Sequence, residues 1–216
     1  MKKLVTLAVL LFVSGLTYTI FLIFQPQDLS TIQGRAEDDR ATRTVDLPKL
    51  IETAALKSRR TVEVTERQVN TWLATHLKAK QEGLLADAVK LKGIWMRFEE
   101  EKGGRCEIII EREIDGHPQT VSMYLRIERK KKENGSYTTL IRKEGGTLLG
   151  MIPVGGRFGQ AKLPQGFLLF INKSMNDFAA LFEQELNWLI EDITRKGAGK
   201  ISFGDQKMRI DFPVKP

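Results

Sequence analysis

The spacing of hydrophobic positions changes three times along the chain, and each spacing predicts a different kind of element. A largely apolar run without a charged residue comes first, from Leu4 to Phe24. Helical spacing of three and four follows near residues 64–80, alternation with a period of two over 89–143, and helical spacing again over 164–196. This order predicts an N-terminal apolar helix followed by an α+β domain.

The apolar run predicts a transmembrane signal anchor over residues 1–25. Its 21 residues rise about 1.5 Å each in a helix, roughly 31 Å in all, which is enough to cross a hydrocarbon core of about 30 Å. Lys2 and Lys3 precede the run, and Asp28 is the only charged residue among the ten that follow it, so we expect the N-terminus in the cytoplasm. The predicted localisation is the cell membrane, crossed once at residues 4–24, with the C-terminal domain on the periplasmic or extracellular face.

Two other interpretations of this run stay open. Cleavage of a signal peptide near Gly15 would leave residues 16–24 as an exposed apolar terminus. A helix buried in a domain core is a third explanation of the same composition. The anchor and the signal peptide agree that residues 26–216 lie outside the cytoplasm.

Residues 26–45 predict a flexible tether, because they are polar, contain Pro26 and Gly34 and show no sustained apolar period. The extracytoplasmic α+β domain is expected over 46–216 and begins with a short helix near 47–57.

A capped helix is the clearest local signal. Thr65 and Gln68 have the spacing of a capping box, in which each side chain accepts a hydrogen bond from the backbone N–H of the other residue. We expect this helix to run to about Lys80, after a short extended segment at 61–64. Its apolar stripe consists of Val69, Trp72, Leu73 and Leu77.

Four strands joined by short turns are expected over residues 89–143, because Asp115-Gly116 and Asn134-Gly135 are hairpin signals. They predict an antiparallel meander. The glycine-rich segment 145–159 is either the start of a strand or a mobile apolar loop, and a last hairpin is expected over 200–212.

Pro164 is expected in the first turn of a long C-terminal helix that ends near Lys196. This helix is apolar around much of its circumference, so we expect the meander sheet to curve around it. Such a wrap forms either a packed core or a groove for an acyl chain, and the pattern does not separate the two. The residues expected to line the core or groove are Ile94, Met96, Phe98, Met123, Leu125, Phe167, Ile171 and Phe178.

No arrangement of catalytic or metal-binding residues stands out. Cys106 is the only cysteine, which excludes an internal disulfide, and two histidines leave little material for a metal centre. The glycines of 150–159 lack the Lys-Ser or Lys-Thr of a phosphate loop, while Glu111 and Glu113 alternate along a strand as on a solvated face. We therefore expect no enzyme activity, no cofactor and no metal.

The net charge of +7 falls to +5 beyond the anchor, because without Lys2 and Lys3 there remain 32 of the 34 basic residues against 27 acidic ones. A modest positive excess suits an anionic membrane surface or a nucleic acid, and the extracytoplasmic location argues against nucleic acid. A basic run precedes the second hairpin turn and consists of Arg129, Lys130, Lys131 and Lys132. It is either solvated surface or a contact with anionic lipid.

The order of elements resembles the tubular lipid-binding (TULIP-like) superfamily, in the form of small membrane-anchored bacterial proteins of the YpmS and LmeA-like kind. The resemblance covers roughly residues 60–213 and is carried by Val62–Leu73, Leu149–Val154, Ile201–Gly204 and Met208–Ile210. It implies a curved sheet around a helix, and binding of a lipid or another apolar ligand.

We therefore expect a membrane-anchored domain that binds a lipid or other apolar ligand near the membrane surface. The alternative is a non-enzymatic interaction module of an envelope assembly, in which strand edges or residues 145–159 contact a partner protein. A third hypothesis is an enzyme whose site is assembled from scattered residues.

Overall fold

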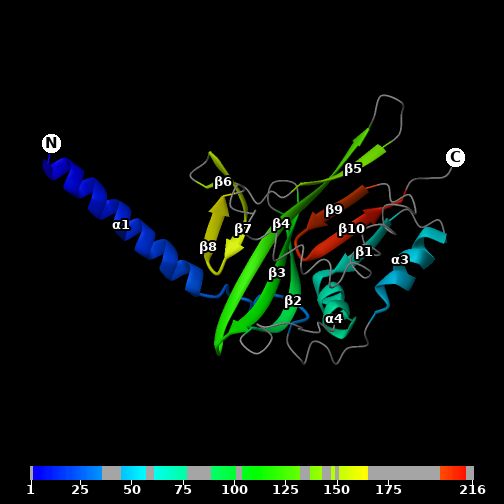
Figure 1. Ribbon diagram of the computed structural model, residues 1–216. Coiled ribbons are helices and arrows are strands. Elements are labelled where there is room, and N and C mark those ends of the chain that lie inside the picture. The colour runs from blue at the N-terminus through cyan, green and yellow to red at the C-terminus, as the bar shows by residue number, and fades with distance from the viewer. Residues whose placement is uncertain are drawn as a thin grey trace.

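The computed structural model describes residues 2–35, 45–56, 61–76, 89–100, 104–131, 137–142, 147–148, 151–164 and 200–212. In these residues it is an α+β structure with antiparallel sheets and an N-terminal apolar helix, as expected (Figure 1). The helices are α1 (Lys2–Phe24), α3 (Leu47–Leu56) and α4 (Glu66–His76). The strands are β1 (Thr61–Thr65), β2 (Val89–Glu99), β3 (Arg105–Ile114), β4 (His117–Lys131), β5 (Tyr137–Arg142), β6 (Thr147–Leu148), β7 (Ile152–Phe158), β8 (Ala161–Pro164), β9 (Lys200–Gly204) and β10 (Lys207–Asp211).

The smaller sheet has the order β1-β10-β9. The expected C-terminal hairpin is confirmed as β9 and β10, and the expected extended segment at 61–64 is confirmed as β1. The two lie side by side although they are far apart in the sequence, with Val64 opposite Met208 and Val62 opposite Ile210. This pairing places alternate apolar side chains of both strands on one buried face.

The larger sheet has the order β2-β3-β4-β7-β6, with β5 paired to β4 and β8 paired to β7. The strands β2, β3, β4 and β5, consecutive in the chain, are the antiparallel meander that the alternating pattern predicted. The long strand β4 pairs with β3 through residues 117–125 and with β5 through residues 126–131.

The glycine-rich segment contains strands rather than only a loop. Within it, β7 pairs with β4 on one side and with β8 on the other. A Cβ atom at Gly156 would lie 2.1 Å from the backbone oxygen of Ser122, so only glycine lets β7 approach β4 this closely.

The start expected for the long C-terminal helix is wrong, because Pro164 is the last residue of β8. Proline suits the end of a short strand as well as a first helical turn, and its backbone needs no N–H donor in either place. The rest of the expected helix, with Phe167, Ile171 and Phe178, lies outside the described residues.

The capping box before α4 is confirmed. The Gln68 backbone N–H donates to Thr65 Oγ1 at 3.2 Å, and the Thr65 N–H donates to Gln68 Oε1 at 2.9 Å. Val64 and Val69, which flank the cap, are both buried, as in a hydrophobic staple.

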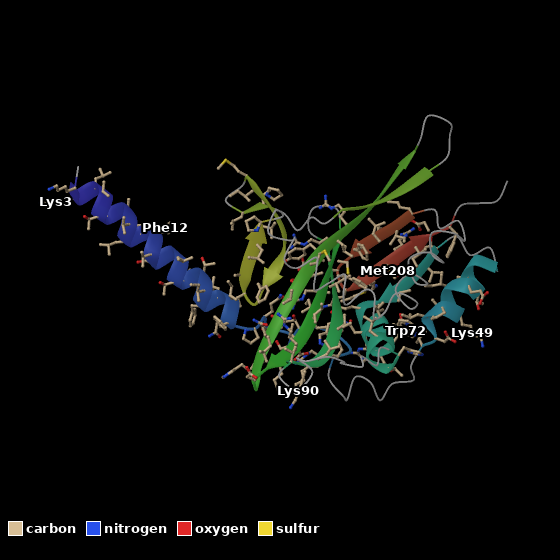
Figure 2. All side chains as sticks on the ribbon, viewed as in Figure 1. Lys3, Phe12, Lys49, Trp72, Lys90 and Met208 are labelled. Carbon is tan, nitrogen blue, oxygen red and sulfur yellow. The ribbon has the colours of Figure 1, made fainter. Side chains whose placement is uncertain are left out.

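The main core lies between α3, α4, the smaller sheet and one end of the larger sheet. Trp72 of α4 and Met208 of β10 belong to it (Figure 2). Its buried members are Leu47, Ile51, Ala54, Val62, Val64, Val69, Trp72, Leu73, Phe98, Cys106, Met208 and Ile210.

Candidate functional site

Helix α1 projects away from the rest of the structure, and none of its residues is buried (Figure 1). It is long and apolar enough to cross a membrane. A helix of a protein core is mostly buried, so the exposure of α1 argues against that interpretation of the apolar run. The chain therefore has an N-terminal apolar helix that suits a membrane anchor.

The end of α1 is held by the turn between β7 and β8. The Gln160 backbone N–H donates to the carbonyl oxygen of Leu22 at 2.9 Å. At Gly159, which has φ +57, a Cβ atom would lie 2.4 Å from the carbonyl oxygens of both Ile23 and Gln25. The last carbonyls of a helix have no i+4 partner, and that of Leu22 also accepts the Gln25 N–H at 3.3 Å. The turn thus supplies a cap for α1 from a distant part of the chain.

Residues 27–35, expected in the flexible tether, pack against the larger sheet. The Gln27 N–H donates to Thr120 Oγ1 at 2.9 Å, and Leu29 and Ile32 are buried against Trp95 and Ile109. Two apolar residues among polar ones give no periodic signal, which is why the sequence pattern suggested a tether. Residues 36–44 lie outside the described part of the chain.

Directly opposite residues of paired strands point to the same side of a sheet, so the register of the larger sheet assigns its side chains to two faces. We call the apolar face the side that carries three rows of paired residues. They are Ile94, Ile110, Val121, Phe158 and Ala161; Met96, Ile108, Met123 and Leu163; and Phe98, Cys106 and Leu125.

All five expected groove or core residues in the described part lie on this apolar face: Ile94, Met96, Phe98, Met123 and Leu125. Three of them are buried, whereas Met96 and Leu125 are half-buried. The row of Phe98 joins the main core, and the opposite end of the face reaches Phe158 and Leu163, which pack against Val121.

The opposite face carries Trp95 and Ile109, which pack against the segment after α1, and a polar cluster around Glu107, whose side chain is fully buried. Ser122 Oγ donates to its Oε1 at 2.5 Å, Arg97 Nη1 lies 3.2 Å from its Oε2, and Arg157 Nε lies 3.4 Å from its Oε1. Gln27 Nε2 in turn donates to Ser122 Oγ at 3.0 Å. The carboxylate is inaccessible and surrounded by donors, so it links β3 to β2, β4 and β7, and through Ser122 to the segment after α1, rather than facing a substrate.

Tyr124 extends this cluster. Its hydroxyl accepts a hydrogen bond from Arg157 Nε at 2.5 Å, and the Arg105 guanidinium lies 4.6 Å from the centre of its ring. Burial, together with the negative charge of Glu107, raises the pKa of Tyr124 to about 12. The phenol is therefore a neutral hydrogen-bonding group at physiological pH.

Two buried polar side chains of α4 bind the backbone of β2 along the edge that faces away from β3. Asn70 Oδ1 accepts from the Met96 N–H at 2.7 Å while its Nδ2 donates to the Met96 carbonyl at 2.8 Å. Glu66 Oε2 accepts from the Phe98 N–H at 2.9 Å, and its other oxygen accepts from the Gln33 N–H at 3.0 Å. Burial raises the pKa of Glu66. The sequence reasoning missed both residues, although two polar positions four apart on the buried side of a helix are a usable signal.

Glu111 does not lie on a solvated face as expected. Trp95 Nε1 donates to its Oε2 at 2.7 Å, and Arg35 Nη2 donates to its Oε1 at 2.7 Å. Burial alone would raise the pKa of Glu111, but these two hydrogen bonds outweigh it and the pKa is lowered. The ion pair with Arg35 fixes the far end of the segment that follows α1.

The expected basic run lies at the end of β4. Arg129, Lys130 and Lys131 end β4 opposite Thr139, Thr138 and Tyr137 of β5, whereas Lys132 lies outside the described residues. Cys106 is buried, and this burial raises the pKa of its thiol.

An open pocket of about 480 Å³ lies between α3 and β1. Its described lining is a mixture of charged, polar and apolar residues: Asp46, Lys49, Leu50, Thr53, Ala54, Thr61, Val62 and Glu63.

Comparison of the chain with family models, with curated proteins and with solved structures found no match. The resemblance to the tubular lipid-binding superfamily therefore rests on the sequence stretches named above.

Proposed function

We propose that this chain is a single-pass membrane protein whose extracytoplasmic domain binds a lipid or another apolar ligand at the membrane surface. One observation carries the proposal: the apolar face of the larger sheet extends to Phe158 and Ala161, which flank the Gly159–Gln160 turn that caps α1. A continuous apolar surface therefore leads from the end of the anchor toward the core.

The rows of this face supply the contacts that an acyl chain needs. The row from Ile94 to Ala161 crosses five strands without a charged residue, and in the next row Met96 and Ile108 are only half-buried. Apolar surface removed from water contributes about 25 cal/mol per Å², so an acyl chain laid on the half-buried members of these rows is stabilised without any polar partner; they include Met96, Ile108, Phe158 and Leu163. An acyl chain that left the bilayer beside α1 would meet Phe158 first.

The orientation follows from charge around α1. Lys2 and Lys3 are the first residues of α1 and Asp28 is the charged residue closest after it, which favours a cytoplasmic N-terminus. The sheet and its apolar face then lie on the periplasmic or extracellular side.

Photo-crosslinking of the full chain in vesicles tests this function. The vesicles contain phosphatidylglycerol with a photoactivatable group on one acyl chain. We expect crosslinks in peptides of β2–β4 and β8 as well as in α1. Crosslinks confined to α1 would contradict the proposal.

Two neighbouring residues of β8 supply a matched pair of variants. Leu163 lies on the apolar face and Lys162 is exposed on the other side. Leu163→Gln should lower the crosslinking of β2–β4, whereas Lys162→Gln should leave it unchanged.

A second function, binding of an extended segment of an envelope protein, is favoured by the open pocket beside β1. In the smaller sheet β1 is an edge strand, and edge strands accept an additional strand from a partner. Thr53→Arg would fill the pocket, so it should abolish crosslinking to such a protein partner and leave lipid crosslinking intact.

A further inference from the structure

We propose that the end of the β6–β7 hairpin is a second membrane contact, which enters the interface of the leaflet from which α1 emerges. This inference rests on the anchoring role of α1 in the proposed function, but not on lipid binding by the apolar face. The surface consists of Met151, Ile152 and Pro153 with Leu148 of β6, and we call it the hairpin tip.

The hairpin tip is apolar and exposed. Met151 is 81% exposed and Ile152 is 41% exposed, and among the described residues outside α1 these are the exposed large hydrophobic side chains. No charged residue occurs from Gly145 to Gly156. A charged group would oppose entry into a bilayer, so its absence over this length is what insertion requires.

The hairpin tip is also ordered by local contacts. The Met151 N–H donates to the Leu148 carbonyl at 3.2 Å, and Leu148 lies opposite Ile152 in the pairing of β6 with β7. Two apolar side chains are thus held at a turn and do not need to be ordered when they meet the bilayer, which lowers the entropic cost of binding.

The position of the hairpin identifies the bilayer as its partner. From the hairpin tip β7 runs to the Gly159–Gln160 turn, which caps α1, so one strand connects the tip with the end of the anchor. Figure 1 shows α1 and strands β6–β8 of the larger sheet together on one side of the domain, with the smaller sheet, α3 and α4 on the other side. The apolar phase that accepts the exposed side chains of α1 is therefore continuous with the surroundings of the hairpin tip.

Fluorescence quenching of the full chain in vesicles of phosphatidylcholine and phosphatidylglycerol tests this contact. An environment-sensitive label is attached to the Met151→Cys variant, and Cys106 stays unlabelled because it is buried. Phe12→Cys in α1 and Lys49→Cys in α3, at opposite ends of the molecule, are the controls (Figure 2). All three positions are exposed, so the substitutions leave the fold unchanged.

At position 151 we expect quenching by spin-labelled lipid and protection from iodide, as at position 12, with the reverse at position 49. Iodide quenching at 151 with lipid quenching at 12 would overturn the hairpin contact and leave the anchor standing. Iodide quenching at both 151 and 12 would overturn the hairpin contact and the proposed function together.

Discussion

Gln160 donates its backbone N–H to the carbonyl oxygen of Leu22, so a turn of the larger sheet is bonded to the last turn of the apolar helix. The bond joins two residues that are far apart in the sequence. A Cβ atom at the neighbouring Gly159 would lie within 2.7 Å of three carbonyl oxygens at or just after the end of α1, those of Leu22, Ile23 and Gln25. This joint fixes the direction in which the domain leaves α1. A flexible tether would leave that direction free.

Gly159→Ala tests the joint. The substitution places a methyl group against the helix carbonyls at a positive φ, so we expect a loss of roughly 2–3 kcal/mol in the free energy of unfolding of the full chain in micelles. Gly116→Ala is the control, because Gly116 has φ +81 but nothing within 4 Å of the added Cβ atom. A loss in Gly159→Ala no larger than in the control would mean that the joint does not stabilise the structure.

Asn70→Leu tests the covered edge of β2. Leucine has a similar volume but leaves the N–H and carbonyl of Met96 without their partner, so we expect the free energy of unfolding to fall by about 2–4 kcal/mol. Urea denaturation measures it, and Glu63→Leu on the exposed side of β1 is the control for a surface leucine. Equal stability of the two variants would refute the edge-covering role of Asn70.

Local sequence patterns predicted the elements of this fold well. The capping box of Thr65 and Gln68, the Asp115-Gly116 turn and the C-terminal hairpin depend on residues a few positions apart, and each is found as expected. The apolar face was also predictable, because the alternation of Ile94, Met96 and Phe98 assigns them to one side of a strand.

Contacts between distant segments could not be predicted in the same way. Gln27 and Arg35 pack against the sheet through Thr120, Ser122 and Glu111, partners about 75–95 positions away. A polar residue gives the same local signal whether it is solvated or bonded to such a partner, so the segment resembled a tether. Glu107 was overlooked for the same reason, since its partners on β2, β4 and β7 are brought together only by the sheet.

Glu107→Gln tests the buried cluster. Loss of the negative charge leaves the partly buried Arg97 and Arg157 without their counter-charge, and we expect a cost of roughly 3–5 kcal/mol in unfolding free energy. Glu113→Gln removes an exposed ion pair with Lys92 in the same sheet and should have little effect. Similar stability of both variants would show that Glu107 is not a structural charge.

The pKa values of Glu66 and Glu111 should be shifted in opposite directions. Hydrogen bonds hold the pKa of Glu111 below its ordinary value of 4.5, so its contribution to stability is present above that value and is lost as the pH falls through the lowered pKa. Burial raises the pKa of Glu66, so its contribution is present below the ordinary value and is lost as the pH rises through the raised pKa.

Carbon NMR of the side-chain carboxyl groups measures both titrations. We expect the midpoint of Glu111 below that of Glu66, and we expect Arg35→Met to move the midpoint of Glu111 upward with that of Glu66 unchanged. Midpoints in the reverse order would contradict the contacts described for these two residues.

The most direct test of a membrane-anchored domain outside the cytoplasm is labelling of thiols on intact cells, or on spheroplasts where an outer membrane is present. Lys3→Cys places a single accessible thiol at the start of α1 and Lys49→Cys places one in α3, because the native Cys106 is buried. A membrane-impermeant maleimide should modify the Lys49→Cys variant in sealed cells and the Lys3→Cys variant only after lysis. Protection of the Lys49→Cys variant until lysis, or recovery of the chain in the soluble fraction, would contradict the account.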